Sequence, residues 1–480
     1  MTVVDSVLGN LLIFMIFVAV LFLIYRLGVR AAAKGWLAPE KMRIVVIAAA
    51  ILVAAVSIGW VALCHVRPGA DGRALCYVAG LIMEGRYSTM TPPGYMSYNP
   101  HQYSLLLVIQ ILFRLFGTDN YQAFQYMNAL CMPLLFYSGY KLLWLICHKR
   151  EACFYYILIF LGCMPLFIYI PYVYGEITSI TFTMVLMWQV VSYCKGGGKA
   201  SIFCGTLAAV AACVMRMNSL IVLVAAGIVL IVYALREAKP QAVVWLIVIF
   251  VSVFAVDGCI RIYYEKISGR EVLDGIPYIS YVLMGLKDGS RGPGWYDESN
   301  YNELLEHNYD TEWTALDNRA DVKARLREFW EDKAYGIDFF LRKILSQWNS
   351  PAYHSLFETR RFDCEVEELP NIVRWIYYEG EDSVKDYMNR YQFLLYFMTA
   401  FYVASALVHR KRERFLEDRI LLIAVIGGFL FSIVWEAMSR YVLPYVVYMI
   451  PLAAVGVWRI RELLTGIKAK WDMIFSGGRF

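Results

Sequence analysis

Apolar runs of about 20 residues recur through most of this 480-residue chain. A helix needs about 20 apolar residues to cross a bilayer, and such runs are too long for ordinary core helices. The runs that reach or approach this length are 8–30, 42–64, 121–147, 152–171, 174–194, 199–215, 219–235, 241–262, 391–409, 418–437 and 440–458. Only 18% of the residues are charged, against about a quarter in soluble domains. The sequence therefore predicts an all-α, polytopic membrane protein with membrane lipid as its surroundings and no nucleic-acid partner.

The topology depends on a shorter apolar stretch at 104–116, which contains Arg114. A stretch of this length is more often interfacial or re-entrant than spanning. If it does not cross, the main basic clusters all share one side, which the positive-inside rule makes cytoplasmic. These clusters comprise Arg26, Arg30, Lys34, Lys41, Arg43, Lys149, Arg150, Lys195, Lys199, Arg236, Lys239, Arg410, Lys411, Arg412, Arg414, Arg459, Arg461, Lys468 and Lys470. We therefore expect about eleven transmembrane helices, with the N-terminus outside and the C-terminus inside.

This topology divides the chain into three regions. Residues 1–262 form an N-terminal transmembrane module, whose first outer loop (65–120) includes juxtamembrane helices, one of them amphipathic over 72–87. Residues 263–390 are too long for a structureless loop, so we expect a small helical extracytoplasmic subdomain. Residues 391–480 contain the last transmembrane helices and a basic cytoplasmic tail. The first apolar run lacks a preceding basic residue and a cleavage site, so it is interpreted as a retained helix rather than a signal peptide.

Polar residues of the first outer loop are candidates for a site. Asp71 comes at the start of the amphipathic helix, where capping is the ordinary role of an acid. Arg73 and Glu84 lie on the polar side of that helix, where solvation also explains them. The segment 95–103 then brings Tyr98, His101 and Gln102 to the start of the short apolar helix. There, His101 is either a helix-start residue or a ligand donor, and the tyrosines also suit a membrane aromatic belt.

Further polar residues are predicted at the outer ends of later spans. Glu176 opens a span, where the helix dipole favours a carboxylate. Arg216 and Asn218 lie between two apolar runs, and a guanidinium there suits phosphate, because its fork of donors matches phosphate oxygens. Glu436 and Arg440, with Tyr441, precede the last span, where a local i,i+4 ion pair is the alternative. Since all these residues are expected at one depth on one side, the sequence favours a polar cavity that opens outward.

In the order of these polar residues along the chain, and in their positions next to apolar runs, the sequence resembles the GT-C superfamily of membrane glycosyltransferases. That superfamily is typified by protein O-mannosyltransferases and the lipid A aminoarabinose transferase, and the resemblance is strongest to polytopic glycosyltransferases of Gram-positive bacteria. The resemblance runs from about Pro68 to Pro451. The residues that carry it are Asp71, Gly85-Arg86-Tyr87, Tyr98-Asn99-Pro100-His101-Gln102, Leu115-Phe116-Gly117, Glu176, Glu436, Arg440, Tyr441 and Pro444.

The resemblance implies an enzyme that moves a sugar from a polyprenyl-phosphate carrier to a glycan, lipid or protein acceptor. It implies a multi-pass protein of the cell membrane with its active site on the extracytoplasmic face. Asp71 is then the catalytic base. The family often has an adjacent acidic pair there, whereas this chain has Asp71-Gly72, which leaves a second catalytic carboxylate to Glu84 or Glu176.

The remaining candidates take binding roles in this reading. Arg216 is the leading phosphate partner, followed by Arg440 and Arg73. The expected substrate-binding residues are Glu84, Tyr98, His101, Gln102, Asn218, Glu436 and Tyr441. No cofactor is required and no ligand cluster demands a metal, although the chemistry has room for a divalent ion. Cys76 and Cys364 fall in outer segments where they could pair.

Two other classes of function remain open at this point. A transporter or flippase of lipid-linked sugars should have polar residues through the full depth of several spans and helices broken at mid-bilayer. A polysaccharide polymerase or ligase should depend on Arg and His of the long outer loop rather than on Asp71.

Overall fold

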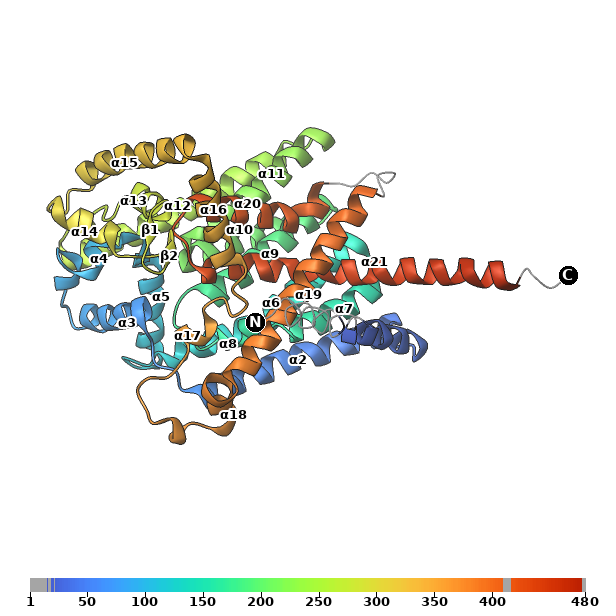
Figure 1. Ribbon diagram of the computed structural model, residues 1–480. Helices are drawn as coiled ribbons and strands as arrows, with labels where there is room; N and C mark the ends of the chain where they lie inside the picture. Colours follow the sequence, from blue (N-terminus) through green and yellow to red (C-terminus); the bar gives the residue numbers. More distant parts are fainter. Residues whose placement is uncertain (1–14, 16–18, 21, 409–415, 477–480) are drawn as a thin grey trace, which may run out of the picture.

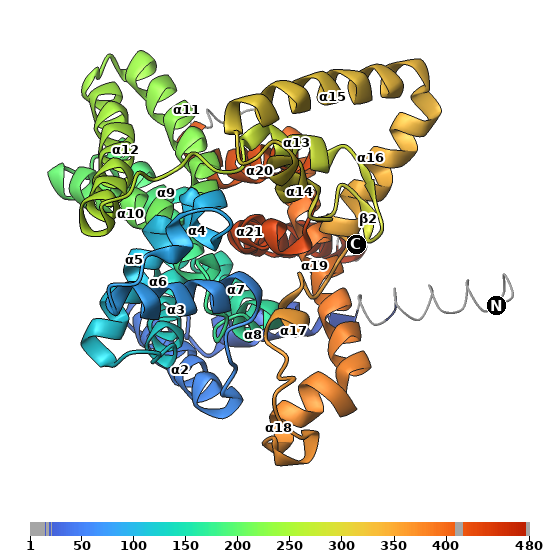
Figure 2. The same ribbon diagram turned by 90° about the vertical axis from the view of Figure 1, so that its left-hand side faces the viewer.

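Long helices running side by side make up most of the molecule. The computed structural model describes residues 15, 19–20, 22–408 and 416–476 (Figure 1). Ten helices form the bundle: α2 (Pro39–Cys64), α6 (Gln122–Cys147), α7 (Arg150–Leu161), α9 (Glu176–Cys194), α10 (Lys199–Met215), α11 (Leu220–Glu237), α12 (Gln241–Ser268), α19 (Glu381–Val408), α20 (Ile420–Val434) and α21 (Leu443–Ser476). Seen end-on, α21 lies near the centre of the molecule (Figure 2).

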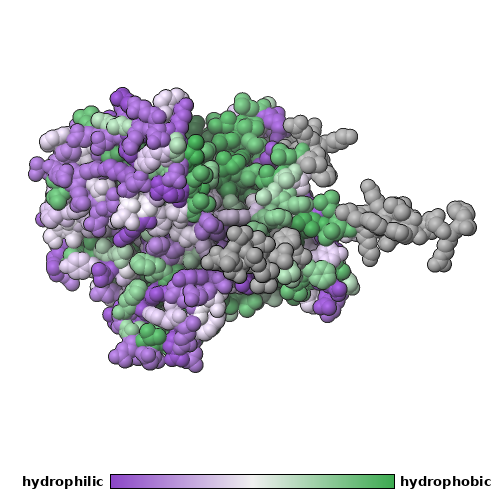
Figure 3. Space-filling model, in the orientation of Figure 1, coloured by the Kyte–Doolittle hydropathy of each residue, from purple (hydrophilic) through white to green (hydrophobic). Residues whose placement is uncertain are grey.

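The outer surface of this bundle is apolar. On the face seen in Figure 3, a hydrophobic belt covers the bundle and the left-hand end is mostly hydrophilic. On α20 the exposed side chains Ile426, Leu430 and Val434 recur every four residues and thus line one face of the helix. Such an outward apolar face suits lipid rather than water, which agrees with the predicted multi-pass, all-α membrane fold.

The predicted number of eleven crossings is not established. Six of the described helices are both long and apolar enough to cross a membrane, namely α2, α6, α9, α12, the segment Met217–Glu237 and the segment Ser439–Thr465. The predicted span 152–171 is divided between α7 and the short α8 (Met164–Ile168), while α20 has 15 residues. Part of the predicted span 8–30 and all of the basic segment 410–414 lie outside the described residues.

The two ends of the bundle differ in their charged residues. Helix α9 begins at Glu176 and ends next to Lys195, which pairs with Asp418 at 2.7 Å. Its 19 residues extend about 28 Å, close to the hydrocarbon thickness of a bilayer of about 30 Å. Arg236, near the end of α11, pairs with Glu417 at 3.0 Å at this second end. Glu176 and the predicted basic loops are therefore at opposite ends of the bundle.

The first outer loop packs at the Glu176 end. It comprises α3 (Ala70–Met83), η1 (Ser88–Met90), α4 (Tyr95–Tyr98), η2 (Pro100–Gln102) and α5 (Tyr103–Phe116). The apolar face of α3, made by Leu75, Val78, Ala79 and Ile82, is buried, and α3 packs against α5. Helix α5 has 14 residues, about 21 Å, and runs across the direction of the long helices (Figure 1). Its length and direction agree with a segment that does not cross.

The second outer segment is mainly helical and lies at the same end. It contains α13 (Tyr278–Gly285), β1 (Asp288–Gly289), β2 (Gly292–Pro293), α14 (Ser299–Glu306), α15 (Thr311–Glu331), α16 (Lys333–Trp348), α17 (Ser355–Glu358), η4 (Val366–Glu368), α18 (Asn371–Arg374) and η5 (Trp375–Glu379). Leu286, Phe329 and Phe339 form a small core of its own. Because α12 continues to Ser268 and α19 begins at Glu381, both long helices extend beyond the predicted borders at 263 and 390.

Candidate active site

Five charged side chains from distant segments meet at the outer-loop end of the bundle. We call Asp71, Glu176, Arg216, Glu358 and Arg440 the arginine–carboxylate cluster. Asp71 lies in the first turn of α3, Glu176 starts α9, and Arg216 joins α10 to η3 (Met217–Ser219). Glu358 ends α17, and Arg440 belongs to η7 (Ser439–Val442), which leads into α21. Four of these five residues are sequence candidates, and the structure brings them together.

Arg440 is the hub of this cluster. Its Nη1 donates to Oε1 of Glu358 at 2.8 Å and to the hydroxyl of Tyr172 at 2.7 Å. Its Nη2 lies 3.8 Å from Oδ2 of Asp71, and its Nε lies 3.8 Å from Oε1 of Glu176. The Arg440 side chain is 7% exposed. A buried guanidinium needs such partners, because an unpaired buried charge is costly. Among the ion pairs of the described residues, Arg440 is thus held by three distant carboxylates and not by Glu436, the local partner considered from sequence.

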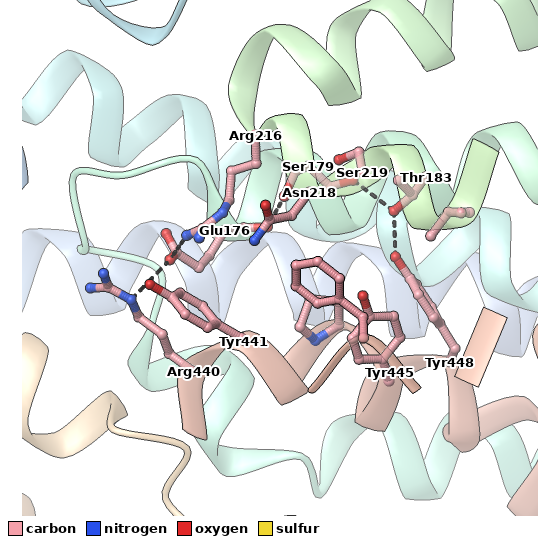
Figure 4. A pocket seen from close by; sticks show the side chains of 13 residues that line it. Glu176, Ser179, Thr183, Arg216, Asn218, Ser219, Arg440, Tyr441, Tyr445 and Tyr448 are labelled. Atoms are coloured by element: carbon pink, nitrogen blue, oxygen red, sulfur yellow. Dashed lines mark hydrogen bonds and ion pairs between the residues drawn. The ribbon is translucent and has the colours of Figure 1, made fainter. Parts of the chain in front are cut away.

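Arg216 approaches the same carboxylate from the opposite side. Its Nη1 donates to Oε1 of Glu176, so that Glu176 lies between the two guanidiniums (Figure 4). The guanidinium carbons of Arg216 and Arg440 lie 5.1 and 5.4 Å from the ring centre of Tyr174, and each lies 5.5 Å from that of Tyr441. Aromatic faces attract cations at these distances. The two rings thus help to keep two like charges close together.

Asp71 is the cluster carboxylate that remains open to solvent. Its side chain is 38% exposed, compared with 3% for Glu176 and 5% for Glu358. Its Oδ1 accepts a hydrogen bond from the hydroxyl of Tyr95 at 3.1 Å. The residue that caps α3 is Gly69, and no side chain caps that helix end. Asp71 is therefore not the helix cap that was the ordinary alternative, and it is directed at the cluster.

A glycine lets α3 approach the segment that precedes Glu176. A Cβ atom at Gly72 would lie 2.4 Å from the backbone oxygen of Val173, closer than real Cβ contacts. Any side chain at position 72 would therefore push Asp71 away from Arg440.

The segment before α5 adds neutral polar groups beside the cluster. Gln102 donates to the hydroxyl of Tyr174 and lies 3.2 Å from Nε2 of His101. Burial lowers the pKa of His101 to about 4, while nearby Asp71 opposes this effect. The imidazole is therefore neutral at pH 7. The ring of Tyr98 packs between Tyr95 and Tyr301, with centroid distances of 5.6 and 4.6 Å.

A cavity leads from the two arginines into the bundle. Its volume, measured as the space open to the centre of a water-sized sphere, is about 40 Å³. Its lining comprises Glu176, Ser179, Thr183, Arg216, Asn218, Ser219, Val222, Phe431, Arg440, Tyr441, Pro444, Tyr445 and Tyr448. Glu176, Ser179 and Thr183 follow one face of α9 over seven residues, about 10 Å. Near the inner limit, the hydroxyls of Thr183 and Tyr448 lie 2.6 Å apart. The cavity is thus charged at its start and lined by hydroxyls and apolar groups further in.

Glu436 lies in the link between α20 and η7. Its Oε1 accepts from the hydroxyl of Tyr441 at 3.4 Å, and the residue is 5% exposed. Burial raises the pKa of Glu436 to about 7, with Arg440 opposing. The Glu436 carboxyl is thus near half-protonation at neutral pH.

Two sequence candidates lie apart from the cluster. Glu84 is exposed and pairs with Arg86 at 2.9 Å. Arg73 is exposed on the outer face of α3. Glu84 therefore lies outside the cluster, whereas Glu176, the other sequence candidate for a second carboxylate, is part of it.

Glu358 is the cluster residue that sequence reasoning missed. Burial raises the pKa of this carboxyl, and Arg440 opposes the effect. Glu358 comes from the second outer segment, and its neighbours His354, Ser355 and Thr359 form no motif. No pattern in the sequence marks it, because only folding brings α17 onto η7.

Metal and disulfide chemistry have no centre in the described part of the chain. No group of three or more His, Cys, Asp or Glu side chains there is arranged to hold a metal ion. Cys76 and Cys364 are both free thiols in the structure, so the pairing considered from sequence is not formed.

Comparison with known proteins gives a family but no characterised relative. Residues 2–459 match the model of a family described as conserved hypothetical integral membrane protein. No curated protein and no solved structure matches the chain.

Proposed function

The chain belongs to the family of conserved hypothetical integral membrane proteins, and we propose that it is a glycosyltransferase with a lipid-linked sugar donor. In this proposal it moves a sugar from a polyprenyl-phosphate carrier to a glycan, lipid or protein acceptor at the extracytoplasmic face. The observation that carries the proposal is one accessible carboxylate, Asp71, 3.8 Å from a buried guanidinium that lines a cavity between helices.

Asp71 is suited to act as the general base. A base must reach the hydroxyl of an acceptor, and Asp71 is the exposed carboxylate of the cluster. The hydrogen bond from Tyr95 holds one oxygen and leaves the rest of the carboxylate available. Glu176 is proposed as a positioning residue rather than a second base, because it is buried between Arg216 and Arg440.

The two guanidiniums are suited to the leaving phosphate. Arg216 and Arg440 both line the cavity, and fixed cations lower the energy of a transition state in which negative charge develops on phosphate oxygens. Their buried partners and the tyrosine rings hold both groups in place before the substrate arrives. The apolar residues Val222, Phe431 and Pro444 of the same cavity suit the first part of a lipid chain.

The proposed reaction balances without a cofactor. Asp71 takes the proton of the acceptor hydroxyl, whose oxygen forms a bond to the anomeric carbon of the sugar. The bond between that carbon and the phosphate oxygen breaks, and its electron pair leaves with the polyprenyl phosphate. Arg216 and Arg440 face the phosphate oxygens as this charge develops.

Turnover by purified protein tests the proposal. Full-length protein in lipid nanodiscs is supplied with a panel of radiolabelled polyprenyl-phosphate sugars and a membrane extract as the source of acceptor. We expect release of polyprenyl phosphate by the wild type and a loss of about 100-fold or more in Asp71→Asn, since general-base catalysis contributes about 10²–10⁴-fold. Equal turnover by both proteins would remove Asp71 from the proposed role.

A matched variant separates this role from a general effect of charge. Glu84→Gln removes a carboxylate from the same outer loop, but one that is exposed and paired with Arg86. It is expected to keep wild-type turnover. Similar losses in Asp71→Asn and Glu84→Gln would attribute the effect to the loop as a whole.

A flippase of lipid-linked sugars is the second candidate. The predicted span 152–171 is broken between α7 and α8, and discontinuous helices are typical of transporters. The two functions differ in their products. In liposomes, a flippase moves the intact donor between leaflets, whereas a transferase consumes the donor only when an acceptor is present.

A further inference from the structure

Helix α16 of the second outer segment has an exposed aliphatic stripe. Ile337, Leu341 and Leu345 are 62%, 55% and 58% exposed. A spacing of four residues places them on one side of the helix. Lys343 and Gln347 lie on the other side and are buried. The helix buries Phe339 and Trp348 as expected for a subdomain surrounded by water, but it also turns this second, aliphatic stripe outward.

Hydrogen bonds fix the C-terminal half of α16 against the end of α20. Nζ of Lys343 donates to the carbonyl oxygens of Ile433 at 2.9 Å and Trp435 at 2.8 Å. Nε1 of Trp348 donates to the hydroxyl of Ser432 at 2.9 Å. These contacts place the second half of α16 at the level of the last turn of α20.

The aliphatic stripe therefore adjoins the lipid-facing surface of the bundle. The outward side chains of α20 are Ile426, Leu430 and Val434, which are 50%, 58% and 46% exposed. In Figure 1, α16 stands across the direction of the long helices, at the level where the apolar belt of Figure 3 begins. This is the level of the bilayer surface for a bundle whose belt is embedded in lipid.

We propose that the outward face of α16 is embedded in the bilayer–water interface of the outer leaflet. Its occupant is lipid and not a second copy of the chain, because the stripe continues the surface that α20 already turns to lipid. Trp330, just before α16, is 74% exposed, and Nζ of Lys333 lies 5.1 Å from its ring centre. Tryptophan together with a cation is typical of a membrane interface.

This contact with lipid has a consequence for the link that follows α20. The Lys343 and Trp348 bonds connect the lipid-embedded helix to the backbone that continues through Glu436 to Arg440. Lipid contact on α16 thus helps to hold that link in place. The inference does not depend on the activity of the site.

Photo-crosslinking in a bilayer tests the inference. The photoreactive residue p-benzoylphenylalanine replaces Ile337, Leu341 or Leu345, one at a time, in full-length protein reconstituted in nanodiscs of phosphatidylglycerol and phosphatidylcholine. After illumination, intact-mass measurement separates lipid adducts, protein–protein adducts and uncrosslinked chain. We expect lipid adducts as the main product at all three positions.

Two matched positions calibrate the yield. Leu430 on α20 is the positive control for lipid, and Lys323, exposed on α15, is the negative control. Lipid adducts at α16 positions in at least half the yield found at Leu430 would support the inference. Dimeric adducts would identify a second copy as the occupant and overturn it. Yields as low as at Lys323 would overturn it as well, since three independent positions cannot all fail through misfolding if each variant elutes as a single species.

Discussion

Arg440 illustrates how one buried side chain can organise a site at the scale of the residue. It is 7% exposed and lies within 3.8 Å of three carboxylates that come from three different segments. Two guanidiniums face three carboxylates in the cluster, so the cost of burying each charge depends on the presence of the others. Removing one cation leaves buried carboxylates without compensation, which is more costly than never having buried the pair.

A double-mutant cycle measures this dependence. Arg440→Met is expected to destabilise the protein by about 3–5 kcal/mol, because the buried Glu358 loses its partner and Glu176 keeps only Arg216. Adding Glu358→Gln should restore part of that loss, since the orphaned charge is removed. Thermal unfolding of the four proteins in one detergent gives the coupling. If the losses of stability in the two single variants simply add up in the double variant, the contact between Arg440 and Glu358 is contradicted.

Lys343 gives the protein a specific dependence on pH. Burial lowers the pKa of Lys343 from 10.5 to about 7, and nearby Glu436 opposes the effect. Between these values the unfolded chain binds the proton and the folded chain releases it, so the free energy of unfolding rises with pH from about 7 to 10. The rise is at most about 1.4 kcal/mol per pH unit.

Substitution by methionine isolates this slope. In Lys343→Met, the free energy of unfolding should rise less steeply with pH above 7 than in the wild type. Lys333→Met, which changes an exposed lysine of the same helix, should leave the wild-type slope intact. Unfolding curves at pH 6.5, 7.5 and 8.5 provide the comparison. If the free energy of unfolding depends on pH in the same way in the wild type and in Lys343→Met, Lys343 is not the source of this dependence.

At the scale of the element, the docking of α3 decides whether Asp71 reaches the cluster. The helix start rests on the backbone before α9, and Gly72 leaves no space between them. The distance of 3.8 Å between Asp71 and Arg440 therefore depends on a residue that takes no part in chemistry.

Gly72→Ala tests this docking. The new methyl group would meet the oxygen of Val173 at 2.4 Å, so α3 must shift, at a cost of about 1–3 kcal/mol. Turnover is expected to fall along with stability, because Asp71 moves away from Arg440. Gly80→Ala is the control in the same helix, since its methyl group meets nothing closer than 3.5 Å. If both variants keep full turnover, the close approach has no role in the activity.

The charged ends of the bundle define the orientation at the scale of the whole molecule. Ser88 is exposed in the first outer loop, and Lys149 is exposed between α6 and α7. The cluster lies at the first of these ends and the pairs of Lys195 and Arg236 lie at the second. The positive-inside rule predicts that the second end faces the cytoplasm.

Labelling in intact cells tests this orientation. A membrane-impermeant maleimide should modify Ser88→Cys in intact cells, and should modify Lys149→Cys only after the membrane is opened. The unsubstituted chain gives the background of its eleven cysteines. Labelling of Lys149→Cys alone in intact cells would reverse the topology, and labelling of both positions would exclude it. Either result would remove the support for an extracytoplasmic site.

The sequence by itself determined the multi-pass helical fold and predicted that candidate residues gather at the end of the bundle opposite the basic loops. Both follow from local properties, because apolar run length sets what can cross a bilayer and basic loops set its orientation. Asp71, Glu176, Arg216 and Arg440 could be selected in the same way, as single charges at the ends of apolar runs. The number of crossings could not be determined from the sequence, because α7 and α8 divide one apolar run and α20 is short.

Only the tertiary structure decided which carboxylates share the cluster and which one stays accessible. Burial is a property of packed segments, so the sequence did not show that Glu176 is 3% exposed while Asp71 is 38% exposed. Glu358 entered the cluster, and Glu84 was left out of it, through the docking of α17 and α3 on distant helices. The contact between Glu358 and Arg440 joins residues 82 positions apart, and no local pattern encodes it.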